Sequence, residues 1–313
     1  MLNGMRLWRI DFRGVRELYY LGRMNSVDED WPNRVRRRSG FPAAGKEAAM
    51  SDRTILIGDI HGCQRTLDAL LTKIAYTPEE DRIIFVGDYI DRGPHIRETL
   101  DHLIRLQEKA GDRAVFLMGN HEKMLLDVAD STWKGRRFFE HPARNTADRK
   151  HLTFLIDGCR IWLWNGGTET ERQIFGLERA VYDRYLEWLS RNLVYDYRDE
   201  AGRFFVTHAG AGYGMELDDI ETKIWNRSGS YDGPLVICGH TPVKKPSLFR
   251  QSFRREYSEY GRAYELPSNG MLDIDTACVF GRSLTAMIII GRRFYLESAE
   301  NCESGTEGGE RDE

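Results

Sequence analysis

Three short apolar runs in the first half of the chain each end at a glycine that is followed by a polar residue. Such runs are typical of buried strands, and the segments between them, 66–74 and 96–106, carry the apolar spacing of a helix. This alternation predicts a parallel sheet with right-handed crossovers, whose strands all end at one edge. The three junctions are Gly58-Asp59 after 54–57, Gly87-Asp88 after 83–86 and Gly119-Asn120 after 114–118.

The second half of the chain is rich in predicted strands. Helices are expected from His121 onward and over 182–193. Two of the later apolar runs lead into a histidine, in Val206-Thr207-His208 and in Cys238-Gly239-His240. An α/β fold of two packed mixed sheets flanked by helices is therefore expected. The later strands are predicted at 204–206, 235–237, 271–274, 284–290 and 293–296.

The two ends of the chain differ in composition from the segment between them. Residues 1–50 carry arginine clusters, and three interpretations stay open: a basic arm, a targeting segment, or an upstream artefact with Met50 as the true start. We favour a flexible, non-catalytic extension or a mis-assigned start. Residues 300–313 are rich in Gly and Glu, which predicts a disordered acidic tail. The folded domain is therefore expected over 51–299.

Charge and composition exclude several classes of protein. A net charge of −4 and a pI near 6.1 indicate no basic field directed at nucleic acid. No run of about 18 apolar residues is present, so no transmembrane segment is predicted. Five cysteines without a CxxC pair argue against a disulfide framework and favour a reducing, cytoplasmic location. The sequence does not indicate the oligomeric state.

The polar residues at the strand ends are of the types that bind metal ions. They offer carboxylate, amide and imidazole donors but no thiolate, which suits Mn²⁺, Fe or Zn²⁺ better than Ca²⁺. A bridging carboxylate would hold two ions about 3.5–4 Å apart. Two-metal sites with this spacing catalyse in-line displacement at phosphorus. One strand-end Asp or His is more often a turn residue, yet four of the eight histidines fall in these motifs. The candidate ligands are Asp59, His61, Asp88, Asn120, His208 and His240.

Three motifs together carry a resemblance to a known family. The segments GDIHG (58–62), GDYIDRG (87–93) and GNHE (119–122) resemble the phosphoprotein phosphatase (PPP) family of the calcineurin-like metallophosphoesterase superfamily. Within it, the chain looks most like the bacterial and bacteriophage-type serine/threonine protein phosphatases. The resemblance implies a metallophosphoesterase catalytic domain over 51–299, which hydrolyses phosphate monoesters by direct attack of metal-bound hydroxide. Further matching segments are 165–168, 224–227, 239–242 and 272–276.

The resemblance also implies a role for each candidate residue. Two ions, with Mn²⁺ favoured and Fe or Zn²⁺ as alternatives, would be held by two ligand sets that share Asp88. His121 would be the general acid and Asp91 would orient it. Arg92, Arg227 and Asn120 would bind the substrate phosphate. The first ligand set is Asp59, His61 and Asp88, and the second is Asp88, Asn120, His208 and His240.

Other functions share most of these residues. A symmetrical bis(5'-nucleosyl)-tetraphosphatase (a diadenosine tetraphosphate hydrolase) or a related nucleotide- or RNA-end hydrolase would have the same fold. Those tetraphosphatases usually lack the aspartate of the DRG element and have GNHD, so Asp91 and Glu122 favour the protein phosphatase. A non-catalytic phosphopeptide-binding module is disfavoured because all the ligands and the acid are present. The expected partner is a phosphoprotein or a phosphorylated small molecule.

The rim of the expected site departs from the family pattern. Ala277 stands where many relatives have Gly, and Phe280 and Arg282 also differ, which leaves the substrate class open. Glu122 and the segment 165–167 are expected to line the mouth. Cys63 follows the first motif and is interpreted as a packed small residue and not as a nucleophile.

Overall fold

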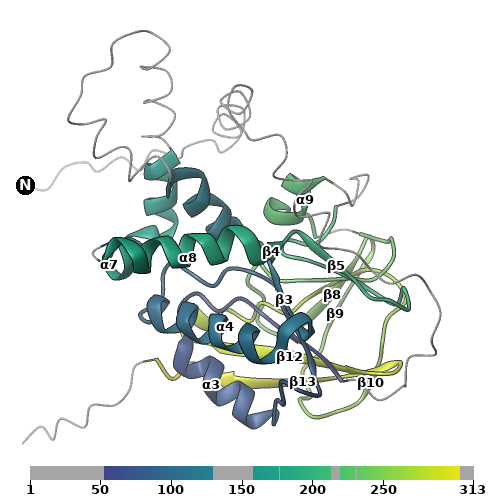
Figure 1. The fold of residues 1–313 in the computed structure, drawn as a ribbon. Coiled ribbons are helices and arrows are strands. Elements are labelled where there is room, and N and C mark those ends of the chain that lie inside the picture. Colours follow the sequence, from purple (N-terminus) through teal and green to yellow (C-terminus); the bar gives the residue numbers. More distant parts are fainter. Residues whose placement is uncertain (1–52, 130–157, 176, 213–218, 230, 304–313) are drawn as a thin grey trace, which may run out of the picture. The chain divides into compact units, whose positions relative to one another are not determined.

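The computed structural model in Figure 1 describes residues 53–129, 158–175, 177–212, 219–229 and 231–303. The chain divides into two units, and in the smaller one, 1–44 with 127–161, the described residues are the helical 127–129 and 158–161. Every feature discussed below belongs to the larger unit, 45–126 with 162–313. The predicted basic extension, 1–50, and positions 304–313 of the predicted tail lie outside the described residues.

The first sheet places the three motif strands side by side. In sheet order its seven strands are β10 (Tyr264–Glu265), β13 (Arg293–Glu300), β12 (Ser283–Ile290), β1 (Thr54–Ile57), β2 (Arg82–Phe85), β3 (Ala114–Leu117) and β4 (Leu193–Val194). Strands β1 to β4 are parallel, whereas β12, β13 and β10 pair antiparallel. Ile57, Phe85 and Phe116 lie opposite one another, so the three motifs leave the sheet at one level.

The second sheet presents the two histidine motifs in the same way. Its six strands are, in order, β5 (Asp196–Arg198), β6 (Phe205–Thr207), β7 (Val236–Cys238), β11 (Met271–Asp273), β8 (Ser247–Arg250) and β9 (Phe253–Glu256). Strands β6, β7 and β11 are parallel, and β5, β8 and β9 pair antiparallel with their neighbours. The segments with His208 and His240 therefore follow adjacent parallel strands.

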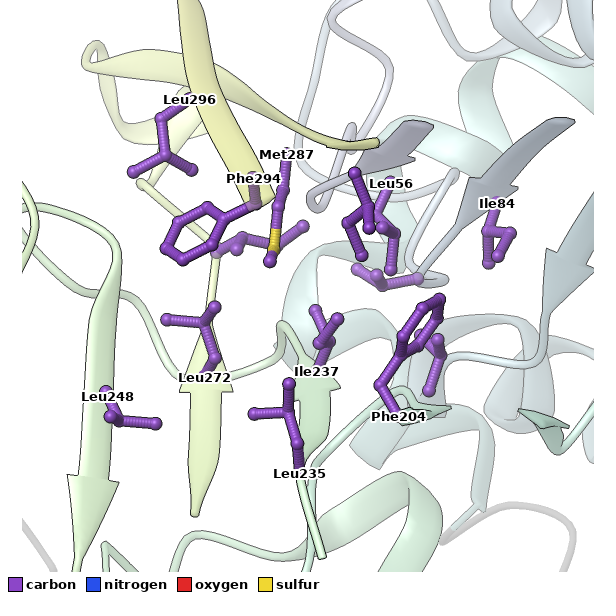
Figure 2. Close-up of a cluster of buried hydrophobic side chains, with 14 of the residues drawn as sticks. Leu56, Ile84, Phe204, Leu235, Ile237, Leu248, Leu272, Met287, Phe294 and Leu296 are labelled. Atoms are coloured by element: carbon purple, nitrogen blue, oxygen red, sulfur yellow. The ribbon is translucent and has the colours of Figure 1, made fainter. Parts of the chain in front are cut away.

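The core lies between the two sheets, where side chains from both meet (Figure 2). Leu56, Ile84 and Met287 come from the first sheet, and Ile237 and Leu272 come from the second. Each of these five side chains is fully buried, so each contributes roughly 1.5–3 kcal/mol of hydrophobic stabilisation. This shared cluster joins the sheets into a sandwich.

Helices cover the other face of the first sheet. Ile55, Ile57, Ile83 and Phe85 alternate with the core residues along β1 and β2 and are also fully buried, which explains why these strands read as continuous apolar runs. Helix α3 contacts β12 and β13, α4 contacts β3, and α8 contacts β4. The helices are α3 (Gln64–Lys73), α4 (Ile96–Ala110), α7 (Thr168–Ile174), α8 (Arg179–Asn192) and α9 (Ile220–Trp225), with short turns η2 (Gly111–Arg113), η3 (Leu163–Gly167) and η4 (Cys278–Phe280).

The predicted fold, two packed mixed sheets flanked by helices, is confirmed. Strands β4, β5, β8, β9 and β10 and helices α7 and α9 were not anticipated. Four positions assigned to the acidic tail, 300–303, belong to the described fold: Glu300 ends β13, and the Glu303 carboxylate accepts hydrogen bonds from Thr66 N (2.9 Å) and Thr66 Oγ1 (2.7 Å) on α3. Among the described helices, none has the length and apolar character needed to cross a bilayer.

Candidate dinuclear metal and phosphate site

The two sheets bring all six candidate ligands together. Asp59, Asp88 and Asn120 follow β1, β2 and β3 of the first sheet, and His208 and His240 follow β6 and β7 of the second. Hydrogen bonds connect the sheets at this point, since His240 N donates to Asp59 Oδ2 at 3.0 Å and His208 Nδ1 bonds the carbonyl of Val86 at 2.9 Å. All six ligand side chains are buried, so a bound ion would have little competition from water.

The loops that carry these residues have unusual backbone geometry. Left-handed φ is uncommon for residues with a Cβ and clusters at functional sites. Five of the seven non-glycine residues with positive φ in the described chain belong to the candidate site: His61 (45°), Asp88 (55°), Asp91 (69°), Arg92 (68°) and His240 (73°).

Two glycines of the motifs are required by close approach and not by backbone conformation. A Cβ on Gly119 would lie 2.1 Å from Asp88 Oδ1, and one on Gly239 would lie 2.0 Å from Asp59 Oδ1. Neither has positive φ. Both glycines therefore allow a candidate ligand carboxylate to lie directly against a neighbouring loop.

The second ligand set contains acceptor atoms that face one another. Nδ1 of His208 bonds the Val86 carbonyl, which can only accept, so Nε2 carries the lone pair of the neutral ring. That Nε2 lies 3.1 Å from Asn120 Oδ1 and 3.3 Å from Asp88 Oδ1, and His240 Nδ1 lies 2.9 Å from the same amide oxygen. A proton on His240 Nδ1 would satisfy the contact with the amide oxygen, whereas His208 Nε2 faces two oxygen acceptors, and a cation between these three atoms would satisfy them.

In the first ligand set, an acceptor nitrogen also faces an oxygen of Asp88. Nδ1 of His61 donates to the carbonyl of Ile90 at 2.7 Å, which leaves Nε2 facing Asp88 Oδ2 at 3.4 Å. The Arg92 guanidinium approaches this nitrogen at 2.6 Å and supplies positive charge there. Asp88 thus directs one oxygen to each histidine group, which is the placement of a bridging carboxylate.

Charge and unsatisfied atoms among the candidate ligands also fit metal ions. Asp59 Oδ1 and His240 Nε2 are buried without a hydrogen-bond partner. Burial first, and then Asp275 and Asp88, raise the pKa of Asp59, so its charge is poorly compensated. Burial alone would also raise the pKa of Asp88, but His208, His121 and His61 hold it well below its usual range. Two groups have donor atoms close enough for one ion each: His61, Asp88 and His121, and Asp88, His208 and His240.

His121 and Asp91 form a buried pair beside these ligands. Nδ1 of His121 lies 2.6 Å from Asp91 Oδ2, and Nε2 points to Asp88 Oδ2 at 3.9 Å. Burial lowers the pKa of His121, whereas Asp88 and Asp91 raise it, so the net direction is downward. Asp91 therefore favours the imidazolium form, but burial outweighs it.

Two residues that orient Asp91 were not predicted. Thr170 Oγ1 donates to Asp91 Oδ1 and accepts from Asp91 N at 2.9 Å, and Trp162 Nε1 donates to Asp91 Oδ2 at 3.0 Å. Thr170 and Trp162 are more than 70 positions from Asp91 in sequence. The nearest segment that the sequence analysis singled out is Asn165-Gly166-Gly167, and it contains neither of these two residues.

Arg92 is partly buried and contacts the ligand cluster through His61. Its N–H donates to the carbonyl of Gly166 at 3.0 Å, and a Cβ on Gly166 would lie 2.5 Å from Arg92 Cγ. The segment 165–167, which was expected to line the mouth of the site, therefore packs against the backbone and side chain of Arg92. The Phe280 ring, 60% exposed, lies with its centroid 5.5 Å from Arg92 Cζ.

Arg227 is placed near the site by its neighbours. Its Nη1 bonds Thr241 Oγ1 at 3.5 Å, directly after His240. Partial desolvation lowers the pKa of Arg227, whereas the carboxylate of Asp88 raises it. The preceding residue, Asn226, is buried. Its side-chain amide donates to the carbonyl of Ala211 at 2.9 Å, which fixes the loop that follows His208.

Glu122 does not line the mouth, which corrects the expectation from sequence. It is fully buried, and its oxygens accept from backbone N–H groups of the second and third motifs. Burial first and the Asp88 charge second raise its pKa to about 8, and a cation bound at Asp88 would offset the second cause. A residue without solvent contact cannot select substrates directly.

Two other expectations concern neighbours of the site. Ala277 has φ of 63°, the left-handed conformation in which glycine is unstrained, so the departure from the family pattern costs about 1–2 kcal/mol. Cys63 is buried, and a hydrogen bond with Cys278 together with burial raises the pKa of its thiol. This agrees with its interpretation as a packed residue, because the thiol form is a weak nucleophile.

Comparison with known proteins confirms the calcineurin-like part of the resemblance but does not single out the PPP family within it. A bis(5'-nucleosyl)-tetraphosphatase PrpE (asymmetrical) of Anoxybacillus flavithermus is 25% identical over 261 residues, 74% of this chain and 88% of that protein. A symmetrical bis(5'-nucleosyl)-tetraphosphatase of Pseudomonas fluorescens is 32% identical over 157 residues, 50% of this chain and 42% of that protein. A crystal structure of a putative diadenosine tetraphosphatase is similar with a TM-score of 0.49 and 19% identity, over 80% of this chain and 94% of that one. The family model of calcineurin-like phosphoesterases matches residues 53–244, and the chain belongs to this family.

Proposed function

We propose that this chain hydrolyses phosphate monoesters at a dinuclear metal centre, with phosphoserine and phosphothreonine of proteins as the leading substrates. The observation that carries the proposal is the buried His121–Asp91 pair, in which Nδ1 is occupied and Nε2 is directed at the ligand cluster. A serine or threonine alkoxide is a poor leaving group and needs a proton as it departs. A nucleotide leaves as a phosphate anion and has less need of one.

The metal ions would be held by the two sets of facing acceptors. Bound there, they would lower the pKa of water and polarise the phosphoryl group. Carboxylate, amide and imidazole donors without thiolate favour Mn²⁺, with Fe or Zn²⁺ as alternatives. The proposed sets are Asp59, His61 and Asp88 for one ion, and Asp88, Asn120, His208 and His240 for the other.

The remaining residues would bind and orient the substrate. Arg92 and Arg227 would hold the phosphoryl oxygens, since guanidinium groups match the geometry of phosphate and stabilise developing charge. Asn120 would add an amide contact. His121 Nε2 would hold the proton for the leaving oxygen, and Asp91, fixed by Thr170 and Trp162, would keep the ring in position.

A dinucleoside tetraphosphate is the second candidate substrate. The relatives that match most of this chain are named as bis(5'-nucleosyl)-tetraphosphatases. The exposed Phe280 ring beside Arg92 could in addition stack a nucleobase while the arginine binds phosphate. Asp91 and Glu122 were the sequence grounds for favouring a protein phosphatase over the symmetrical enzymes, and the buried position of Glu122 weakens that reasoning.

A panel of substrates separates the two candidates. With Mn²⁺ added, we expect phosphoserine and phosphothreonine peptides to have a higher kcat/KM than diadenosine tetraphosphate, with para-nitrophenyl phosphate as a reference for basal turnover. Much faster turnover of the dinucleotide would overturn the leading substrate while leaving the phosphoesterase centre intact. Absence of hydrolysis of all three with Mn²⁺, Fe or Zn²⁺ would overturn the centre itself.

Replacing Phe280 with Ala tests the dinucleotide candidate directly. If a base stacks on this ring, KM for diadenosine tetraphosphate should rise roughly tenfold, because base–aromatic stacking is worth about 1–3 kcal/mol. KM for para-nitrophenyl phosphate should change much less. Phe253→Ala is the matched control, since Phe253 is 50% exposed on β9, which contributes no residue to the site. Equal KM values for the dinucleotide in the Phe280→Ala variant and the parent would show that no base stacks on Phe280.

A further inference from the structure

Glu122 is a buried side chain near the site that has no part in the proposed chemistry, yet it accepts four hydrogen bonds. Its Oε1 accepts from Tyr89 N at 2.7 Å and Ile90 N at 3.1 Å. Its Oε2 accepts from Asp88 N at 2.9 Å and from Gly119 N at 3.2 Å. All four partners are backbone N–H groups, and three of them lie more than 30 positions from Glu122 in sequence.

The three consecutive N–H groups of residues 88–90 form an anion-binding nest. Such nests arise where the backbone takes a left-handed turn, and Asp88 has φ of 55°. Here the acceptor is a carboxyl group of the protein itself. Because burying N–H donors without acceptors is costly, the nest and the carboxylate stabilise each other. The backbone of Asp88 is thus hydrogen-bonded to a side chain that is fully buried.

The link to Gly119 extends this role to the third motif. Gly119 precedes Asn120, and its Cα side leaves room for Asp88 Oδ1. In return, His121 N donates to Asp88 Oδ1 at 3.2 Å. Glu122 and Asp88 thus each bind the backbone of the other's loop. This reciprocal arrangement sets the distance between the bridging carboxylate and Asn120.

We propose that Glu122 is a positioning residue that holds Asp88 in its bridging position by occupying the nest at residues 88–90. The inference rests on the proposed metal centre but not on the substrate class. Glutamine has nearly the same shape, but an NH₂ group replaces one of the two carboxyl oxygens. The backbone N–H groups that bonded to that oxygen would then face a donor and lose their acceptor. The bridging oxygen atoms would then be free to rotate away from His61 and His208.

The test compares two buried glutamates that both accept backbone N–H groups. In Glu122→Gln, we expect the dissociation constant for Mn²⁺, measured by calorimetry on the full chain, to rise about 10–100-fold, as with outer partners of metal ligands. Glu303→Gln is the matched control, because Glu303 accepts from Thr66 on α3 and contacts no candidate ligand. It should lower Tm but leave the Mn²⁺ affinity close to that of the parent.

Three results would overturn the role of Glu122. Parental Mn²⁺ affinity and stoichiometry in Glu122→Gln would show that the nest does not position the ligand. An equal loss of affinity in Glu303→Gln would show that the effect is general destabilisation. If Glu122→Gln does not fold, Glu122→Ala is titrated with formate: restoration of Mn²⁺ affinity supports the nest, and no restoration in the folded variant counts against it. A parent that binds no metal would instead contradict the proposed function.

Discussion

Replacing His121 with Asn is expected to lower kcat for a phosphoserine peptide by about 10²–10⁴-fold, the range contributed by a positioned general acid. Asparagine can keep the contact with Asp91 but has no titratable nitrogen where Nε2 now points. For para-nitrophenyl phosphate the loss should be much smaller, because its phenolate leaves without needing a proton. The comparison of kcat for these two substrates therefore measures the acid role itself.

The metal content of the same variant distinguishes two readings of His121. Its ring lies close enough to His61 and Asp88 to be a ligand, although Asp91 occupies Nδ1. We expect Mn²⁺ content near that of the parent. Loss of metal in this variant would show that His121 is a metal ligand. Equal losses of kcat for both substrates would show that His121 is not the general acid. His102→Asn is the matched control, because His102 also lies near a carboxylate, at 3.1 Å from Asp68, but on the distant helix α4.

The fold could be predicted where a strand or helix carries its own pattern. The strands β1, β2 and β3 are buried on both faces, so each reads as an unbroken apolar run, and α3 and α4 show the helical spacing. The hairpin of β8 and β9 could not be found in this way. All four residues of β9, Phe253–Glu256, are exposed at a sheet edge, and its strand is defined by pairing with β8 and not by burial.

The candidate site was predictable to the extent that its residues lie at strand ends. Parallel pairing brings such positions together whatever the loops do, so Asp59, Asp88 and Asn120 were expected to meet. The partners of Asp91 were not, because Thr170 and Trp162 reach it only through tertiary packing. Glu122 illustrates a third case: the position was noticed, but a sequence motif does not tell whether a carboxylate faces solvent or the backbone.

Replacing Asp88 with Asn should weaken both proposed metal sites at once, since Asp88 is common to both proposed ligand sets. Its Oδ2 lies 3.4 Å from His61 Nε2 and its Oδ1 lies 3.3 Å from His208 Nε2. Asparagine preserves the volume but removes the negative charge and one of the two oxygens. We expect loss of at least one Mn²⁺ per chain and a fall in kcat beyond the roughly 10²–10³-fold caused by removing one electrostatic contact.

Thermal unfolding reports on metal binding at Asp88 without relying on activity. A ligand that binds only the folded state raises the unfolding free energy, by about 2.7 kcal/mol at a concentration 100 times its Kd. Added Mn²⁺ should therefore raise the Tm of the parent but hardly that of Asp88→Asn, while in EDTA the two should be close. Asp68→Asn, an exposed position on α3 beside His102, should respond to Mn²⁺ as the parent does. A parental Mn²⁺ response in Asp88→Asn would mean that the ions bind without this carboxylate, and the shared ligand would have to be sought elsewhere in the cluster.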